Sequence, residues 1–347
     1  MTASTASRVD DLLRTAIVWD NHTCMPLDPR DDRFLPQLER LRETGVTVVG
    51  MNVGYGEQGI EPHVRMLAHF RAWIKSHSER YLQVESVDDV ALAKQTGRLG
   101  IFFDIEGANA IDDQPALIEL YYDLGVRWML MAYNLNNRVG GGCLDHDPGL
   151  SDFGRAVIVE MNRVGMIPCC SHTGKRTVLD VIAASATPVI FSHSNPRAVW
   201  DHPRNIDDEV ILACARRGGV IGINGVGAFL SAGDPGSATL ARHVDYVVQL
   251  AGIDHIAIGL DYVFDQEELK AAFAATPHLF GDAHRYGDRG CPFASPEQIP
   301  ELAAELAGMG YTDADLRKVL GENWLRIARI VWKPKARIDS RPQNDRG

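Results

Sequence analysis

The chain has 347 residues, of which 45% are hydrophobic and 23% charged, a composition typical of globular proteins and not of disordered or fibrous ones. Its formal net charge of -11 argues against nucleic acid or an anionic membrane surface as a partner. No apolar run approaches the roughly 20 residues that cross a bilayer, and residues 1–14 lack the basic start and apolar core of a secretory signal. Six cysteines are too few for a disulfide scaffold at this length, so we expect a cytoplasmic protein.

Short apolar runs alternate with helical segments along the chain. Helical spacing of apolar residues marks 62–77 and 175–184. The strand-like runs are 16–19, 46–53, 101–104, 128–131, 169–172, 190–193, 220–224 and 256–259. Eight such runs predict a (β/α)8 TIM barrel. An open doubly wound sheet is the alternative, but no Gly-x-Gly-x-x-Gly follows the first strand.

The remaining segments fit one barrel domain over residues 1–335. Residues 264–296 are polar and glycine-rich, so we expect a loop with short helices that covers the barrel mouth. The run Gly140–Gly142 lacks the Lys-Ser/Thr of a phosphate loop and is predicted to be a flexible loop. Residues 336–347 are charged and are expected to form a flexible tail.

Two of the strand-like runs end in Ser-His. A strand-helix-strand unit makes parallel neighbours, so His172 and His193 should emerge side by side at one edge of the sheet. Two imidazoles presented together form half of a metal site, whereas the alternative is two unrelated surface histidines.

Other strand ends carry His22, Cys24, Glu106, Tyr133 and Asp261. In a barrel, catalytic residues gather at these ends. Two divalent ions held there would activate a water, with Asp261 moving the proton. Each residue has an ordinary alternative: a loop contact for the histidine, packing for the cysteine and tyrosine, a solvated turn for the glutamate and a helix cap for the aspartate.

Longer motifs run through nearly the whole chain: Gly100–Gly107, Leu124–Trp128, Gly149–Gly154, Asn162–Gly165, Pro188–Ser194, Arg204-Asn205 and Gly321–Arg326. With these motifs the chain resembles the membrane dipeptidase (renal dipeptidase-like, peptidase M19) family of the metal-dependent amidohydrolase superfamily. The resemblance implies a zinc-dependent, homodimeric enzyme with a dipeptide substrate.

The resemblance also implies a role for each site residue. Glu106 would bridge two zinc ions, His172 and His193 would hold one of them, and His22 with the residue two positions on would hold the other. Asp261 would be the acid/base, and Arg204 would bind the dipeptide carboxylate, for which its planar fork is suited.

Two positions depart from the family pattern. Cys24 stands where the family has aspartate; thiolate is a softer zinc ligand, and this change could leave one metal in place of two. Tyr133 stands where the family has a histidine that contacts the substrate carbonyl. Tyrosine donates one hydrogen bond to an oxyanion but carries no positive charge.

The sequence therefore predicts a zinc hydrolase that cleaves the amide bond of a dipeptide, or of a similar small carboxylate-bearing molecule, by metal-bound hydroxide. Catalysis is assigned to Glu106, Tyr133 and Asp261, and substrate binding to Tyr133 and Arg204. One alternative is a mononuclear amidohydrolase acting on a non-peptide or cyclic amide. Another is a non-catalytic metal-binding relative, which would have no chemical need for Asp261.

Overall fold

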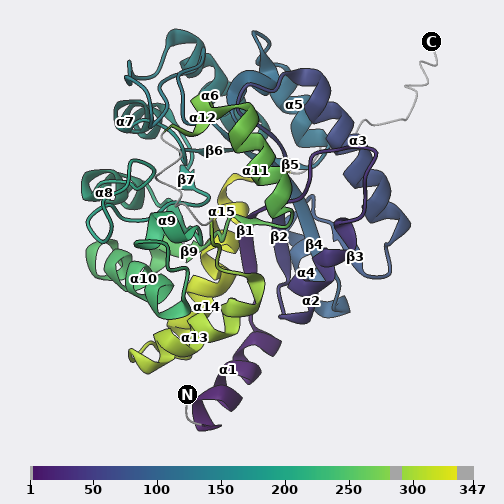
Figure 1. Cartoon of the computed structure of the whole chain (residues 1–347), viewed down its shortest axis with the longest axis vertical. Helices are drawn as coiled ribbons and strands as arrows, with labels where there is room; N and C mark the ends of the chain where they lie inside the picture. Colours follow the sequence, from purple (N-terminus) through teal and green to yellow (C-terminus); the bar gives the residue numbers. More distant parts are fainter. Residues whose placement is uncertain (1–2, 282–290, 334–347) are drawn as a thin grey trace, which may run out of the picture.

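The computed structural model describes residues 3–281 and 291–333, and within them parallel strands close into a barrel surrounded by helices (Figure 1). The barrel closes where Asp20 of the first strand pairs with Ile258 of the last. In ring order the strands are β1 (Trp19–Cys24), β2 (Val48–Tyr55), β4 (Leu99–Glu106), β5 (Val126–Leu130), β6 (Ile167–Cys169), β7 (Ile190–Phe191), β8 (Val220–Ile223) and β9 (Ile256–Ile258). The predicted (β/α)8 barrel is confirmed. The expected tail 336–347 lies outside the described residues, and a single domain over 1–335 stays a prediction.

Two short strands extend this ring. β3 (Tyr81–Gln83) pairs with the first half of β4, and β10 (Tyr262–Val263) continues beyond β9 to pair with the end of β1. The first strand begins at Trp19, three residues later than the apolar run 16–19 predicts, because Ala16 and Val18 are buried without belonging to the sheet.

Helices lie between the strands and cover the outside of the barrel (Figure 1). The helix predicted over 175–184 has those bounds, and the one predicted over 62–77 is Ile60–Ser76. Capping residues explain several ends: Ser86 and Asp89 form a capping box at the start of α4, and Gly97 ends that helix at a φ of 67°. The principal helices are α1 (Ala3–Thr15), α2 (Leu38–Glu43), α3 (Ile60–Ser76), α4 (Val87–Thr96), α5 (Leu117–Asp123), α6 (Asp152–Val164), α7 (Lys175–Ala184), α8 (Asp208–Arg216), α9 (Gly227–Leu230), α10 (Ser237–Ala251), α13 (Ile299–Gly308), α14 (Asp313–Arg317) and α15 (Asn323–Val331).

Bulky side chains fill the barrel interior. Trp19, Phe102 and Trp128 are buried there in one cluster with Trp324 of α15, whose indole Nε1 donates to the carbonyl of Ile258 at 2.9 Å. The interior is therefore a packed core, and ligands must approach from the carboxyl ends of the strands. None of the helices in residues 3–281 and 291–333 is long and apolar enough to span a membrane.

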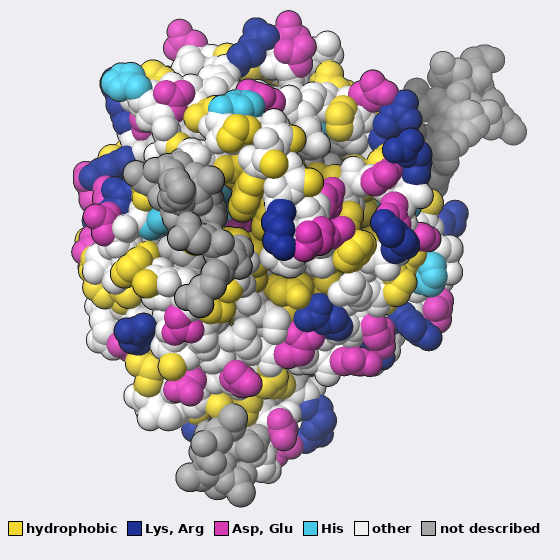
Figure 2. Space-filling view, in the orientation of Figure 1, with side chains coloured by type: hydrophobic (Ala, Val, Ile, Leu, Met, Phe, Trp, Pro, Cys, Tyr) yellow, Lys and Arg dark blue, Asp and Glu magenta, His cyan; other side chains and the backbone are white. Residues whose placement is uncertain are grey.

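Residues 264–281, which follow β10, lie across the barrel opening, and residues 282–290 of the expected loop lie outside the described residues. As expected, residues 264–281 contain short helices, α11 (Gln266–Ala275) and α12 (Pro277–Phe280), and Figure 2 shows hydrophobic side chains gathered over them at the middle of this face. The Gly140–Gly142 run differs from the flexible loop expected, because it is buried and hydrogen-bonded. Gly141 N–H donates to Thr177 Oγ1 at 2.8 Å, and a side chain on Gly142 would collide with the carbonyl of Asn134.

Candidate metal centre

Three histidines converge on one buried carboxylate oxygen at the carboxyl ends of the strands. The Oε1 atom of Glu106, at the end of β4, lies 3.5 Å from His22 Nε2, 3.4 Å from His172 Nε2 and 3.2 Å from His193 Nε2. The last two Nε2 atoms are only 3.0 Å apart. His172 and His193, predicted to emerge side by side at one edge of the sheet, therefore both face Glu106.

The other ring nitrogen of each histidine is held by a neighbour. His22 Nδ1 lies 3.2 Å from Asp104 Oδ2, and His172 Nδ1 lies 2.7 Å from Asn134 Oδ1. Because these partners are acceptors, both Nδ1 atoms donate to them, and both Nε2 atoms face Glu106. In the third ring, His193 Nδ1 lies 2.8 Å from the Ser192 hydroxyl.

This donor set fits a metal cation. Glu106 Oε1 is buried and has no hydrogen bond of normal geometry among the described residues, although three imidazole Nε2 atoms surround it. Donor atoms this close together suit a divalent cation, which binds their lone pairs in place of protons. Imidazole, carboxylate and thiolate are zinc ligands.

Cys24 joins this group from the end of β1. Its Sγ lies 3.5 Å from His22 Nε2 and 3.8 Å from Asp261 Oδ1, so the sulfur faces the cluster and not the core. The side chains form three groups, and within each group the potential ligand atoms lie within 4.8 Å of one another. The groups are His22 with Cys24 and Glu106, Glu106 with His172 and His193, and His22 with His193 and Asp261.

Strained backbone aims three of these side chains. Asn134, His172 and Asp261 have φ values of 58°, 61° and 58°, and they are three of only four non-glycine residues with positive φ in the described ranges. A left-handed backbone costs roughly 1–2 kcal/mol per residue. Its concentration at the strand ends shows that tertiary contacts hold the cluster in place.

Electrostatics divides the three histidines. Burial lowers the pKa of His172 to about 3, with help from the positive charge of Arg204, and burial also lowers the pKa of His193. Burial acts in the same direction on His22, but the charges of Asp104 and Glu106 outweigh it and raise its pKa. Two imidazoles are therefore ready as neutral ligands, and a cation would displace the proton of the third.

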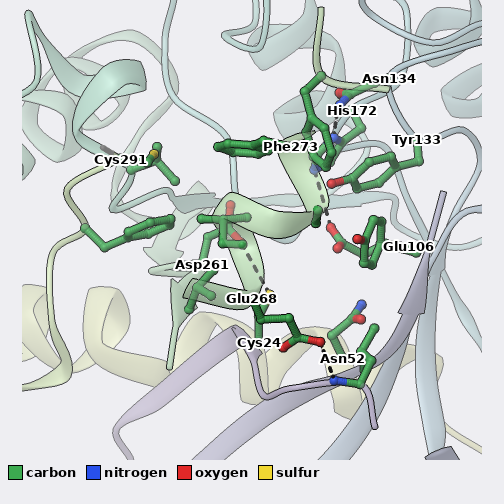
Figure 3. A pocket seen from close by; sticks show the side chains of 18 of the residues that line it. Cys24, Asn52, Glu106, Tyr133, Asn134, His172, Asp261, Glu268, Phe273 and Cys291 are labelled. Atoms are coloured by element: carbon green, nitrogen blue, oxygen red, sulfur yellow. Dashed lines mark hydrogen bonds and ion pairs between the residues drawn. The ribbon is translucent and has the colours of Figure 1, made fainter. Parts of the chain in front are cut away.

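A cavity of about 380 Å³ opens above the cluster (Figure 3). Tyr133, His172 and Glu106 lie on one side of it and Asp261 on the other, and the Tyr133 hydroxyl is directed into the space. The Tyr133 ring stacks on that of His172 at a centroid distance of 4.2 Å.

Arg204 also lines this cavity, although the sequence alone would class it as a surface charge. The residue is only 3% exposed, and its Nε and Nη2 atoms have no hydrogen-bond partner among the described residues. A buried guanidinium with two unpaired donors is suited to an anionic ligand.

Sequence reasoning did not identify the residues that support the ligands. Asp104 orients His22, Asn134 orients His172, and Asn224 donates from Nδ2 to Asp261 Oδ2 at 2.9 Å. Asp104 could have been found, because it lies two residues before Glu106 on the same strand and therefore on the same face. The two asparagines carry no comparable signal.

Comparison with known proteins gives a consistent result. The model of the membrane dipeptidase family, peptidase family M19, matches residues 6–271. A protein called an uncharacterised dipeptidase from Schizosaccharomyces pombe is 33% identical over 66% of this chain, and dipeptidase verJ from Clonostachys rogersoniana is 31% identical over 73% of it. The chain spans only 51% and 61% of the lengths of these two relatives. It spans 96% of an uncharacterised Klebsiella pneumoniae protein from the pqqA 5' region, to which it is 30% identical.

Solved structures show the same fold. An amidohydrolase from Pseudomonas aeruginosa superposes with a TM-score of 0.85 and 31% identity, covering 93% of this chain and 99% of its own. A metallopeptidase from Rhodobacter sphaeroides, solved with a phosphinate mimic of the dipeptide L-Ala-D-Ala, superposes with a TM-score of 0.75 and 19% identity, covering 92% and 100%.

Proposed function

Because this chain belongs to the membrane dipeptidase family, peptidase family M19, we propose that it is a zinc-dependent hydrolase that cleaves the amide bond of a dipeptide or of a similar small carboxylate-bearing molecule. The observation that carries the proposal is the buried Glu106 Oε1, which lies 3.2 to 3.5 Å from three histidine Nε2 atoms. A structural role would not need this arrangement, because buried carboxylates are otherwise hydrogen-bonded.

The ligand groups suggest two cations that share Glu106. His172 and His193 would hold one, and His22 and Cys24 the other. Lewis-acid activation of water and of the amide carbonyl is the chemistry that such cations supply.

We propose that Asp261 moves the proton. Asn224 occupies its Oδ2 atom, while Oδ1 faces the cluster at 3.4 Å from His22 Nε2. Burial would raise the pKa of this carboxyl, but His193 and His22 outweigh burial and lower it, so Asp261 is ionised and can accept a proton. We assign Oδ1 to take the proton of the attacking water and to deliver it to the leaving amine.

Two further residues orient the substrate. The Tyr133 hydroxyl, directed into the cavity, would donate a hydrogen bond to the carbonyl oxygen as it gains negative charge (Figure 3). Arg204 would bind the substrate carboxylate with its two unpaired donors, which fixes the end of the substrate that leaves as a free amino acid.

A direct test uses the purified chain stripped of metal and reloaded with zinc. We expect zinc to restore hydrolysis of at least one member of a dipeptide panel, and a phosphinate dipeptide mimic to inhibit it. The Asp261→Asn variant should bind zinc but lose activity. A zinc-loaded wild type that hydrolyses no member of the panel would rule the proposal out.

Cys24 favours a second candidate, a mononuclear amidohydrolase acting on a non-peptide or cyclic amide. Burial raises the pKa of the Cys24 thiol to about 12, so this ligand is harder to ionise than the aspartate it replaces in the family pattern. Elemental analysis discriminates, with two ions per chain favouring the first candidate and one the second. A non-catalytic relative would bind metal without turnover of either substrate class.

The assembly and location of the protein are proposals as well. The family resemblance suggests a homodimer, and six cysteines, too few for a disulfide scaffold at this length, suggest the cytoplasm. Light scattering of the full chain and fractionation of expressing cells would test these two points.

A further inference from the structure

Four aromatic rings form a continuous wall on one side of the cavity. We define the aromatic wall as Tyr55, Tyr133, Phe273 and Phe280, all of which line the cavity. Tyr55 lies 5.4 Å from Tyr133 and 6.5 Å from Phe280 between ring centroids. Phe280 lies 6.3 Å from Tyr133 and 4.5 Å from Phe273. These four residues come from three separate parts of the chain, so the fold and not local sequence builds the wall.

Space remains next to these rings. Ala271, Ala272 and Ala275 of α11 line the same cavity, so small side chains neighbour Phe273 along the helix. A surface of aromatic rings beside open volume favours a large apolar group, because apolar area is removed from water on binding and ring pairs add attraction.

The position of Arg204 fixes which part of a substrate meets the wall. Arg204 follows β7, and Tyr55 ends β2. These strands lie opposite each other in the ring, with three strands between them in either direction. A substrate whose carboxylate is bound by Arg204 therefore extends across the mouth toward Tyr55, and its far end is the amino-terminal residue.

A second cavity supports this direction. Its volume is about 620 Å³, and it shares only His172 and Arg204 with the first. Its lining is rich in charge and includes Asp147, Lys175 and Arg197. Arg204 thus borders a charged space as well as the first cavity, whereas all four rings of the aromatic wall line the first cavity and none lines the second.

Tyr133 gives an independent reason for the same orientation. Its hydroxyl is the proposed donor to the scissile carbonyl, and its ring belongs to the aromatic wall. The residue that contributes that carbonyl must therefore place its own side chain near the wall.

We propose that the aromatic wall is the subsite for the side chain of the amino-terminal residue, and that it selects dipeptides whose amino-terminal residue is large and apolar, above all aromatic. This inference rests on the proposed hydrolase function and adds the substrate class to it.

The test compares substrates that differ in one side chain. With zinc-loaded wild type, kcat/KM for Phe-Gly should exceed that for Ala-Gly by at least about 10-fold, the lower end of what extra apolar groups gain in a hydrophobic pocket. For the reversed pair, Gly-Phe and Gly-Ala, the two values should be nearly equal. A preference confined to the reversed pair would overturn the assignment.

Variants connect the preference to the wall. Phe273→Ala should reduce the ratio of kcat/KM for Phe-Gly to that for Ala-Gly several-fold. Phe273→Leu keeps an apolar side chain and should reduce this ratio less, and it serves as the test variant if Phe273→Ala fails to fold. Phe153→Ala is the matched control, since Phe153 is a partly buried phenylalanine of α6 that lines neither cavity. A ratio that falls equally in the control, or in none of the variants, would contradict the assignment.

A binding measurement separates this inference from the proposed function. Calorimetry gives dissociation constants for the phosphinate analogues of Phe-Gly and Ala-Gly without requiring turnover. Tighter binding of the phenyl analogue, lost in Phe273→Ala, supports the subsite even if no dipeptide is hydrolysed, an outcome that would refute the hydrolase proposal alone. Equal dissociation constants in the wild type would refute the subsite, whether or not dipeptides are cleaved.

Discussion

Replacing Arg204 with alanine should weaken capture of carboxylate-bearing substrates by about 2 to 3 kcal/mol, the range for hydrogen bonds to charged groups. The side chain is 3% exposed, and its Nε and Nη2 atoms are buried without a hydrogen-bond partner in the described part of the chain. A planar fork with two unpaired donors matches the two oxygens of a carboxylate. The expected loss is roughly 30- to 150-fold in kcat/KM, since 1.4 kcal/mol is tenfold.

The assay is a cycle over enzyme and substrate. Wild type and Arg204→Ala are each measured on a dipeptide and on its C-terminal amide, which lacks the negative charge. Wild type should lose a similar factor on the amide, whereas the variant should discriminate little between the two substrates. For Arg204→Lys, the preference for the acid over the amide should lie between those of wild type and Arg204→Ala, because an ammonium group keeps the charge but not the planar fork.

Stability is the necessary control. Two donors buried without hydrogen bonds destabilise the ligand-free protein, so removing them is favourable. This gain offsets the packing lost on the Phe229 ring, whose centroid lies 5.3 Å from the guanidinium carbon of Arg204. We therefore expect a small change in melting temperature. Arg30→Ala, which removes a side chain that is 87% exposed, should leave kcat/KM unchanged. Equal losses of Arg204→Ala on the acid and the amide would refute the carboxylate clamp.

Three other predictions follow from the cluster and the core. Elemental analysis should find fewer metal ions in Cys24→Ala and at least the wild-type number in Cys24→Asp, because the Cys24 sulfur lies 3.5 Å from His22 Nε2. Unchanged metal occupancy in Cys24→Ala would mean that the thiol only fills space. Zinc at about 100 times its dissociation constant should stabilise the wild type by about 2.7 kcal/mol in thermal unfolding. It should stabilise Glu106→Gln far less, because the oxygen atom that faces the histidines is replaced, and equal stabilisation would exclude Glu106 as a ligand. Burial lowers the pKa of His243 from 6.5 to about 4, so the unfolded chain binds the proton more readily and the free energy of unfolding should fall by up to about 3 kcal/mol as pH falls from about 6.5 to 4. Urea unfolding of His243→Gln should show a smaller decrease over that range, and an identical one would argue against this cause.

The barrel could be predicted from the sequence because its strands are parallel and buried on both faces. Such strands appear as short apolar runs, and each run here ends in polar residues at the mouth. The limits of the method show at the first strand, since the buried residues Ala16 and Val18 resemble strand residues in composition but lie outside the sheet. Gly140–Gly142 misled for a related reason, because glycine can mark tight packing as well as freedom.

The metal cluster could be predicted to the extent that topology determines it. His172 and His193 follow neighbouring parallel strands, so the sequence alone places them together. Asn134 and Asn224 could not be found, because an asparagine that orients a ligand has no characteristic spacing from it. The aromatic wall was equally inaccessible, since the rings of Tyr55 and Phe280 meet only after α11 and α12 fold across the barrel mouth.

The two departures from the family pattern act on different parts of the reaction. Cys24 contacts His22 and Asp261, so we expect its chemistry to concern the donor set of one cation. Tyr133 lies on the other side of the cavity, where it stacks on His172 and also belongs to the aromatic wall (Figure 3). An imidazole there would supply a donor that can carry positive charge, whereas tyrosine supplies a neutral donor and a larger apolar ring. In the proposed mechanism, the exchange would reduce electrostatic stabilisation at the carbonyl and increase apolar contact with the neighbouring side chain. Metal content and side-chain selectivity should therefore respond independently to changes at Cys24 and at the aromatic wall, while changes at Tyr133 should alter turnover and selectivity together.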